Sequence, residues 1–98
     1  MAWPVIEQKL ESLRRALLRI AEKCPEDAAA LAKNIDAQDI LTLNLTRAIH
    51  LCVDIGSHLI ATTNLPPPDT MGETFDILQQ AGIISAVLAM RLKRIVGF

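Results

Sequence analysis

The sequence predicts an all-α protein, an up-and-down helical bundle of four main helices and one short helix. Apolar residues recur every three or four positions in several stretches, which is the spacing of amphipathic helices. No stretch has the strict alternation of apolar and polar residues that is typical of a strand. The 98 residues are 51% hydrophobic but include only one Trp and two Phe, so the core must be aliphatic. Without a linker or repeat, residues 1–98 are expected to form a single domain.

Composition excludes several function classes. The formal net charge of −1 gives no overall attraction to nucleic acid, so any such contact would depend on local basic clusters. Acidic residues stand near the N-terminus where a signal peptide would be apolar. The uncharged run 77–90 is too short and too polar to span a membrane. The two cysteines form no disulfide framework, and Cys52 is expected to be a small buried apolar residue. We therefore expect a reduced, cytoplasmic protein.

The first helix is predicted to begin near Pro4, which suits a first helical turn. Its charged side permits two interpretations. One is a solvated face with a Glu11–Arg15 pair, and the other is a docking patch for RNA or an acidic partner, made by Arg14, Arg15 and Arg19. The apolar seam, about five turns long, consists of Ile6, Leu10, Leu13, Leu17 and Ile20.

Residues 23–33 are expected to contain a break and then a short helix. Pro25 cannot continue the first helix but can open the next one. Glu26 and Asp27 suit a first turn, where carboxylates interact favourably with the helix dipole. Cys24 lies beside the proline, and no neighbour in the sequence indicates a nucleophile or a ligand.

The longest predicted helix covers residues 34–63 and is the central element of the fold. Asp36 is its expected N-cap. Three apolar residues, Leu43, Leu51 and Val53, fall outside its core stripe, so this helix should also contact something beyond its own bundle. At 100° per residue, the core stripe lies within about 60° of Cys52 and consists of Leu41, Leu45, Ala48, Ile49, Cys52, Ile55, Gly56 and Leu59.

The far side of this helix carries a polar strip about 80° wide, formed by Arg47, His50, Asp54 and His58. A metal site is one interpretation, but positions i and i+8 are about 12 Å apart along the axis, so one ion cannot bind all three of His50, Asp54 and His58. A second interpretation is acid–base chemistry with Asp54 orienting an imidazole. The third is an ordinary surface or interface strip. The spacing of the polar strip therefore predicts neither a metal site nor a cofactor site.

The segment after the central helix contains three consecutive prolines, residues 66–68, which predict a stiff, extended connector. Thr70 and Glu73 have the spacing of a capping box, so a new helix should begin there. Its expected inward face is Met71, Phe75 and Leu78.

Gly82 is predicted to stop this helix, because glycine readily adopts the left-handed conformation that follows many helix C-termini. Ser85 is then the expected N-cap of a last helix. Leu88, Leu92 and Ile95 are expected to face inward. The cationic cluster of Arg91, Lys93 and Arg94 suits a helix C-terminus.

Three blocks of the sequence resemble, in order and spacing, the HepT-like family of the HEPN superfamily. The blocks are LNLTRAIHLCVDIGSHLI, PPPDTMGETFDILQQAGIIS and LAMRLKRIVGF. The resemblance covers nearly the whole chain. It implies a homodimeric HEPN-like helical bundle that is the toxin half of a toxin–antitoxin system. It further implies a minimal nucleotidyltransferase (MNT) antitoxin as partner, and metal-independent ribonuclease activity on RNA.

The resemblance also implies a catalytic Arg-x4-His motif directly after a block such as LKRIVGF. In this sequence that block ends at Phe98, so the motif and one further long helix of the family fall outside the 98 residues. The Tyr that the family's antitoxin modifies is also missing, since the sequence contains no Tyr. Asp54 and His58 match the family's Asp-Ile-x-x-His segment near the cleft and are the supporting candidates, whereas His50 matches no fixed position.

Two functional hypotheses follow. In the first, the chain is a HepT-like toxin subunit, a ribonuclease in its intact form and inactive over these 98 residues. Either the sequence is incomplete or the gene is truncated, and incompleteness is favoured because losing the last helix would expose a large apolar face. In the second, a non-catalytic helical dimer serves as an interaction module for the nucleotidyltransferase.

Overall fold

The computed structural model describes residues 3–97, and Phe98 lies outside the described part. Residues 3–97 form helices and no strand, which confirms the all-α prediction. No helix in this range is long and apolar enough to cross a membrane. The helices are α1 (Trp3–Lys23), α2 (Ala28–Ala32), α3 (Ile35–Ile60), α4 (Met71–Gln80) and α5 (Ala86–Val96).

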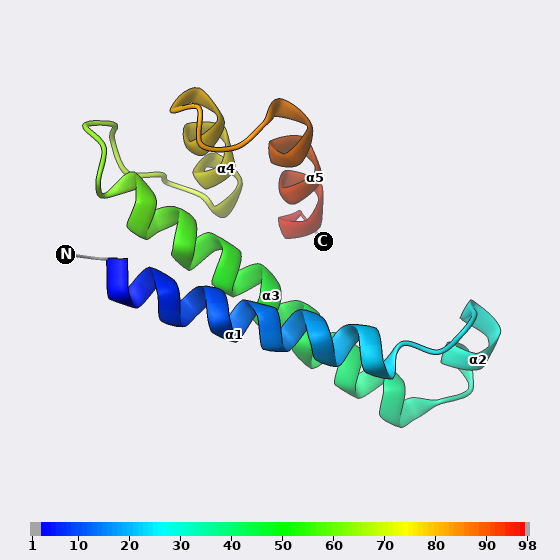
Figure 1. The fold of residues 1–98 in the computed structure, drawn as a ribbon. Coiled ribbons are helices and arrows are strands. Elements are labelled where there is room, and N and C mark those ends of the chain that lie inside the picture. The colour runs from blue at the N-terminus through cyan, green and yellow to red at the C-terminus, as the bar shows by residue number, and fades with distance from the viewer. Residues whose placement is uncertain (1–2, 98) are drawn as a thin grey trace.

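The helices form two groups around α3. Helix α1 runs antiparallel along α3, and the short α2 lies at the far end of this pair (Figure 1). Helices α4 and α5 pack against each other, and α4 contacts α3 (Figure 1). The molecule is elongated, with extents of 48 × 26 × 20 Å. Helix α3 therefore has two main packing partners, α1 along one side and the α4–α5 pair at its C-terminal half, and it also contacts the short α2.

The main buried cluster joins α3 to the α4–α5 pair and consists of Ile60, Phe75, Leu78 and Ala89. Val53, which lies outside the predicted core stripe, packs partly buried against this cluster. The sequence predicted that Val53 contacts something outside the bundle, but its partner is this cluster of the same chain.

The ends of α3 differ from the prediction. Asn34 is the N-cap rather than Asp36, because the Asn34 side chain accepts a hydrogen bond of 3.0 Å from the backbone N–H of Ala37. Asp36 lies in the first turn, where its charge suits the helix dipole. The helix ends at Ile60 instead of Thr63, and the Thr63 hydroxyl donates back to the Ile60 carbonyl at 2.7 Å.

The break between α1 and α2 is confirmed. Helix α1 ends at Lys23, two residues before Pro25. Asp27 is the N-cap of α2 rather than a first-turn residue, and its carboxylate accepts a 2.7 Å hydrogen bond from the N–H of Ala30.

The predicted ends of α4 and α5 are confirmed. Thr70 caps α4 by accepting from the N–H of Glu73 at 3.1 Å. Gly82 has a φ of 76°, and the next residue, Ile83, donates its N–H to the Leu78 carbonyl at 2.9 Å. This bond is typical of a Schellman motif. Ser85 caps α5 through a 3.1 Å bond from Leu88 N–H.

The inward faces of α4 and α5 were predicted only in part. Phe75 and Leu78 are buried, but Met71 is 45% exposed at the first position of α4. On α5 the buried residue is Ala89, while Leu88 and Ile95 remain more than 40% exposed. The small side chain of Ala89 allows α5 to approach the cluster of Ile60, Phe75 and Leu78, so the larger residues of α5 lie at its edge.

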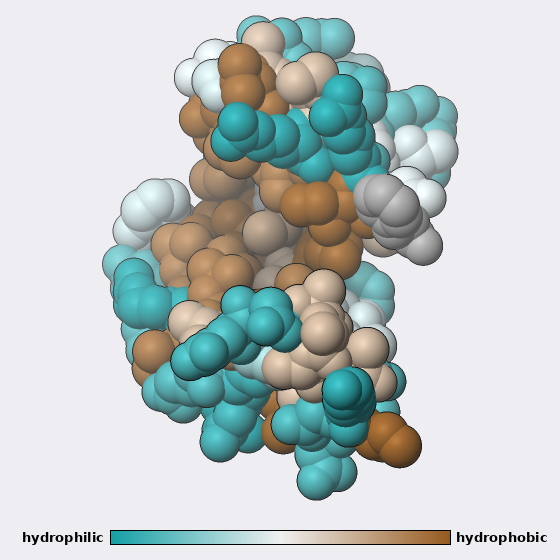
Figure 2. Space-filling view, turned by 90° about the vertical axis from the view of Figure 1, so that its right-hand side faces the viewer, coloured by the Kyte–Doolittle hydropathy of each residue, from teal (hydrophilic) through white to brown (hydrophobic). Residues whose placement is uncertain are grey.

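An open apolar groove separates the α1–α3 pair from α5. Figure 2 shows it as a hollow of hydrophobic residues between the two parts of the molecule. Its volume is about 210 Å³. Leu17 and Leu45 belong to the predicted core seams but stay half-exposed because they border this groove. The lining residues, called the apolar groove below, are Leu13, Leu17, Leu45, Ala48, Ile49, Cys52, Phe75, Leu92, Ile95 and Val96.

Candidate functional site

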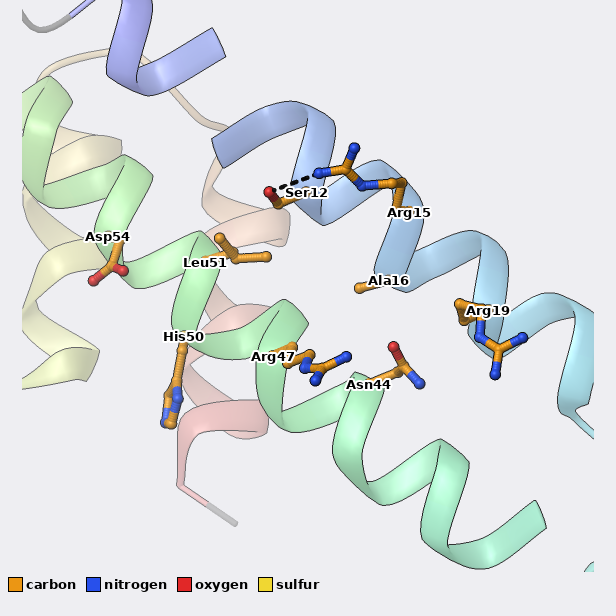
Figure 3. A pocket seen from close by; sticks show the side chains of 9 residues that line it. All are labelled: Ser12, Arg15, Ala16, Arg19, Asn44, Arg47, His50, Leu51 and Asp54. Carbon is orange, nitrogen blue, oxygen red and sulfur yellow. Dashed lines mark hydrogen bonds between the residues drawn. The ribbon is translucent and has the colours of Figure 1, made fainter. Parts of the chain in front are cut away.

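A second, polar groove lies between α1 and α3, and we call it the α1–α3 groove. It is an open depression of about 620 Å³, and Figure 3 shows its side chains arranged along both helices. Helix α1 contributes Ser12, Arg15, Ala16 and Arg19, and α3 contributes Asn44, Arg47, His50, Leu51 and Asp54.

The floor of the groove is held by two buried residues, Ala16 and Asn44, with exposures of 4% and 5%. Ala16 has no side chain beyond Cβ, so the two helices can approach closely at this point. The amide of Asn44 donates a 2.9 Å hydrogen bond to the Ile40 carbonyl one turn earlier in α3. This bond satisfies a buried polar group and fixes its orientation.

The groove carries an excess of positive charge. Arg15, Arg19 and Arg47 line it, and none of them forms an ion pair with another residue of the described range 3–97. Arg15 makes a 3.3 Å hydrogen bond to the neutral hydroxyl of Ser12 (Figure 3). The one acidic side chain of the lining, Asp54, is paired with Lys9 of α1 at 3.3 Å. The guanidinium groups are therefore available to an anion.

The structure divides the predicted polar strip of α3. Arg47, His50 and Asp54 line the groove together, whereas His58 is half-buried one turn beyond Asp54 and does not line it. Asp54 bonds to Lys9 rather than to an imidazole. Within the described residues, no three of the potential ligands His, Cys, Asp and Glu lie close enough to hold a metal ion.

The basic patch predicted on α1 is also divided. Glu11 pairs with Arg14 instead of Arg15, because the i, i+3 position brings these two side chains together. This leaves Arg14 outside the groove, while Arg15 and Arg19 line it. Of the three cations predicted near the end of α5, Lys93 pairs with Asp76 at 3.0 Å.

The sequence did not indicate that Arg15 and Arg19 of α1 would line one groove with Arg47 of α3. This arrangement depends on the antiparallel register of α1 and α3, which the ion pair between Lys9 and Asp54 defines. Ten residues forward from Lys9 lies Arg19, and ten back from Asp54 lies Asn44, and both line the groove. His50, which matched no family position, lines the same groove from α3.

Cys52 is the thiol of the apolar groove. It lines the apolar groove from α3 and is half-buried. Burial raises the pKa of the Cys52 thiol, because desolvation disfavours the thiolate. A thiol of this kind is a poor nucleophile, which agrees with the prediction of an apolar packing role for Cys52.

Comparison with known proteins gives consistent results at the levels of family, sequence and fold. The family model "Ribonuclease HepT-like" matches residues 6–98. The mRNA nuclease HepT of Shewanella oneidensis is 29% identical over 93 residues, covering 95% of this chain and 69% of the relative.

Solved structures agree over nearly the same range. The tri-AMPylated Shewanella oneidensis HEPN toxin in complex with MNT antitoxin superposes with a TM-score of 0.87 at 29% identity, covering 95% of this chain and 69% of that one. A toxin–antitoxin structure with AMP-PNP gives a TM-score of 0.88 at 29% identity, covering 96% and 70%. The sequence blocks, the helical architecture and these matches agree, and the chain belongs to the ribonuclease HepT-like family of HEPN proteins.

Proposed function

We propose that this protein is the toxin subunit of a HEPN/MNT toxin–antitoxin system and that its intact form cleaves mRNA without a metal ion. The observation that carries the proposal is the match of fold and sequence to the Shewanella toxin over 95% of the chain. A helical arrangement kept over that length supports the same placement of the family's functional surfaces.

The chemistry of the proposed reaction belongs to the family's Arg-x4-His motif, which the 98 residues do not contain. In that motif the arginine would polarise the scissile phosphate and the histidine would transfer a proton. Asp54 and His58 are proposed to support these groups from α3. Residues 1–98 alone are therefore proposed to be inactive as a ribonuclease.

A chimera tests this proposal directly. The segment of Shewanella HepT that follows its matched region is fused after Phe98, and cleavage of a labelled mRNA is followed in the presence of EDTA. We expect cleavage by the chimera and none by residues 1–98. A chimera with the motif arginine replaced by alanine is the matched control and should be inactive. Cleavage by residues 1–98, or by the arginine variant, would contradict this assignment of the chemistry.

The supporting role of Asp54 and His58 has a separate test in the active chimera. Asp54→Asn and His58→Gln should each lower kcat by about tenfold, less than the ~10²-fold that a direct proton-transfer group contributes. KM should stay within about twofold, since neither residue is proposed to bind the RNA backbone. An unchanged kcat in both variants would remove these two residues from the mechanism.

The proposed partners are a second copy of the chain and an MNT-type nucleotidyltransferase antitoxin. Large apolar side chains such as Leu17, Leu43 and Leu45 are about half-exposed, and surfaces of this kind support association. Sedimentation should give about twice the monomer mass of 10.7 kDa. Co-expression with an MNT antitoxin should yield a co-purifying complex. If that complex forms and the chimera remains inactive, the non-catalytic interaction module is the correct alternative.

A further inference from the structure

We infer that the α1–α3 groove is a binding site for the phosphodiester backbone of single-stranded RNA. The inference rests on the proposed ribonuclease function, because it assigns the surface along which the substrate strand would lie. It concerns residues that are present in this chain and is independent of the Arg-x4-His motif.

The charge of the groove selects an anion. Arg15 and Arg19 line it from α1 and Arg47 lines it from α3, and the carboxylate of Asp54 is already paired with Lys9. The formal charge of the whole chain is −1, so three arginines that form no ion pair within residues 3–97 are a local concentration of positive charge. Guanidinium groups bind phosphate oxygens through paired hydrogen bonds.

The spacing of these groups suits a repeating anion. Arg15 and Arg19 are one turn apart on α1, about 6 Å along the axis. Arg47 and His50 stand on the opposite wall, on α3, at a separation of about 4.5 Å along that axis. The imidazole of His50 also lines the groove and adds a hydrogen-bond donor. Donors on both walls of an open groove can contact successive phosphates of one strand.

The lining argues against a protein segment as the occupant. Among the lining side chains, Leu51 and Ala16 are the only apolar ones, and Ala16 is buried in the floor. Protein interfaces depend on several apolar or aromatic anchors at their centre, and Leu51 is the single large apolar side chain of this groove. It also has no Phe, Tyr or Trp side chain on which a base could stack. The bases should therefore face solvent, and binding should be independent of sequence.

Binding can be measured with the 98-residue protein by fluorescence anisotropy of a labelled oligo(U) RNA of about 20 nucleotides. The variant Arg19→Gln with Arg47→Gln should raise Kd about tenfold at low salt. Each arginine that contacts a phosphate contributes about 0.7 to the slope of log K against log salt, so the slope should fall by about 1.4. Oligo(A) should bind as oligo(U) does.

The matched control is Arg91→Gln with Arg94→Gln, which makes the same charge change at exposed positions of α5. Circular dichroism should give the same helicity for both double variants, because all four arginines are exposed. The control should change Kd less than twofold. An equal loss in the control, or no loss in the groove variant, would overturn the inference. It would also be overturned if a poly-glutamate peptide of equal charge competed as well as the RNA.

The two proposals fail in different ways. In the active chimera, the groove variant should raise KM with little change in kcat. If the chimera does not cleave but the groove variant still loses RNA binding, the ribonuclease function is wrong and the groove stands. If the chimera cleaves and the groove variant binds and cleaves normally, the groove is wrong and the ribonuclease function stands.

Discussion

Gly56 is the residue at which α3 and α4 come closest. A Cβ placed on it would lie 2.6 Å from Cγ2 of Thr74 and 3.0 Å from Cδ1 of Leu78. Both neighbours are buried, and Thr74 is only 1% exposed. Glycine in the middle of a helix costs about 1 kcal/mol relative to alanine. The chain accepts this cost because the missing side chain allows the two helices to pack in contact.

Gly56→Ala should therefore destabilise the fold despite the better helix propensity of alanine. Overpacking a buried contact costs about 1–3 kcal/mol, and the propensity gain offsets about 1 kcal/mol of it. Urea denaturation should give a net loss of up to about 2 kcal/mol in the free energy of unfolding. Gly72→Ala is the control, since its nearest neighbour atom is 4.0 Å away, and it should cause no loss. Equal effects at the two glycines would contradict the close-packing argument.

Cys52 and Cys24 should differ in chemical reactivity because their surroundings differ. Cys24 is exposed, whereas Cys52 is half-buried in the apolar groove with a raised pKa. A raised pKa means that less thiolate is present at any given pH below it. Alkylation by iodoacetamide, followed by peptide mass mapping, should label Cys24 first. The rate at Cys52 should begin to rise at a higher pH than that of N-acetylcysteine in the same buffer. Faster labelling of Cys52 would show that this part of the fold is open.

At the scale of elements, the turn between α4 and α5 depends on the conformation of Gly82. Its φ of 76° places it in the left-handed region, and no atom lies within 4 Å of a Cβ built there. Gly82→Ala should therefore cost about 1 kcal/mol from backbone strain alone, without any steric clash. Gly82→Asn should cost less, because asparagine tolerates this conformation better. Thermal unfolding of the two variants should show this order, and the reverse order would argue against strain at Gly82.

The ends of helices were largely predictable from sequence because caps are local. Thr70, Gly82 and Ser85 act as predicted, since each bonds to residues only a few positions away. The N-cap of α3 was misassigned because Asn34 and Asp36 are both good capping residues. The sequence contains no local feature that chooses between them.

Burial was less predictable than helix position because it depends on which helices meet. The stripe of α3 was correct for Leu41 and Ile55, which are buried. Val53 lies off the stripe but packs against the α4–α5 cluster, because α3 has two partners on different sides. A single helical wheel assumes one partner, so it cannot place both faces.

At the scale of the whole molecule, the candidate RNA groove required tertiary structure. Its arginines come from two helices, and more than twenty residues of sequence lie between Arg19 of α1 and Arg47 of α3. Either helix alone shows a few cations on a solvated face. Only the antiparallel register, together with the pairing of Asp54 by Lys9, turns them into one positive surface. Of this surface the family resemblance indicated only Asp54, since His58 does not line the groove.

The apolar groove leads to a prediction about the folded protein in solution. Its borders include Leu17 and Leu45, which are 51% and 48% exposed. A continuous apolar surface of this kind should bind the dye ANS under native conditions, unlike the scattered apolar residues of most surfaces. Leu17→Gln with Leu45→Gln should reduce the ANS fluorescence by more than half, and because both residues are half-exposed the loss of stability should be about 1 kcal/mol per site or less.

The matched control is Leu18→Gln with Leu43→Gln, on the same two helices. These leucines are 56% and 50% exposed but do not line the apolar groove. The control should leave ANS fluorescence nearly unchanged, because it removes equal apolar area without interrupting the groove. If both double variants reduced the signal equally, the dye would be reporting general surface hydrophobicity, and the groove would not be a distinct binding surface. Addition of the Shewanella HepT segment in the chimera should lower the signal only if that segment covers the groove.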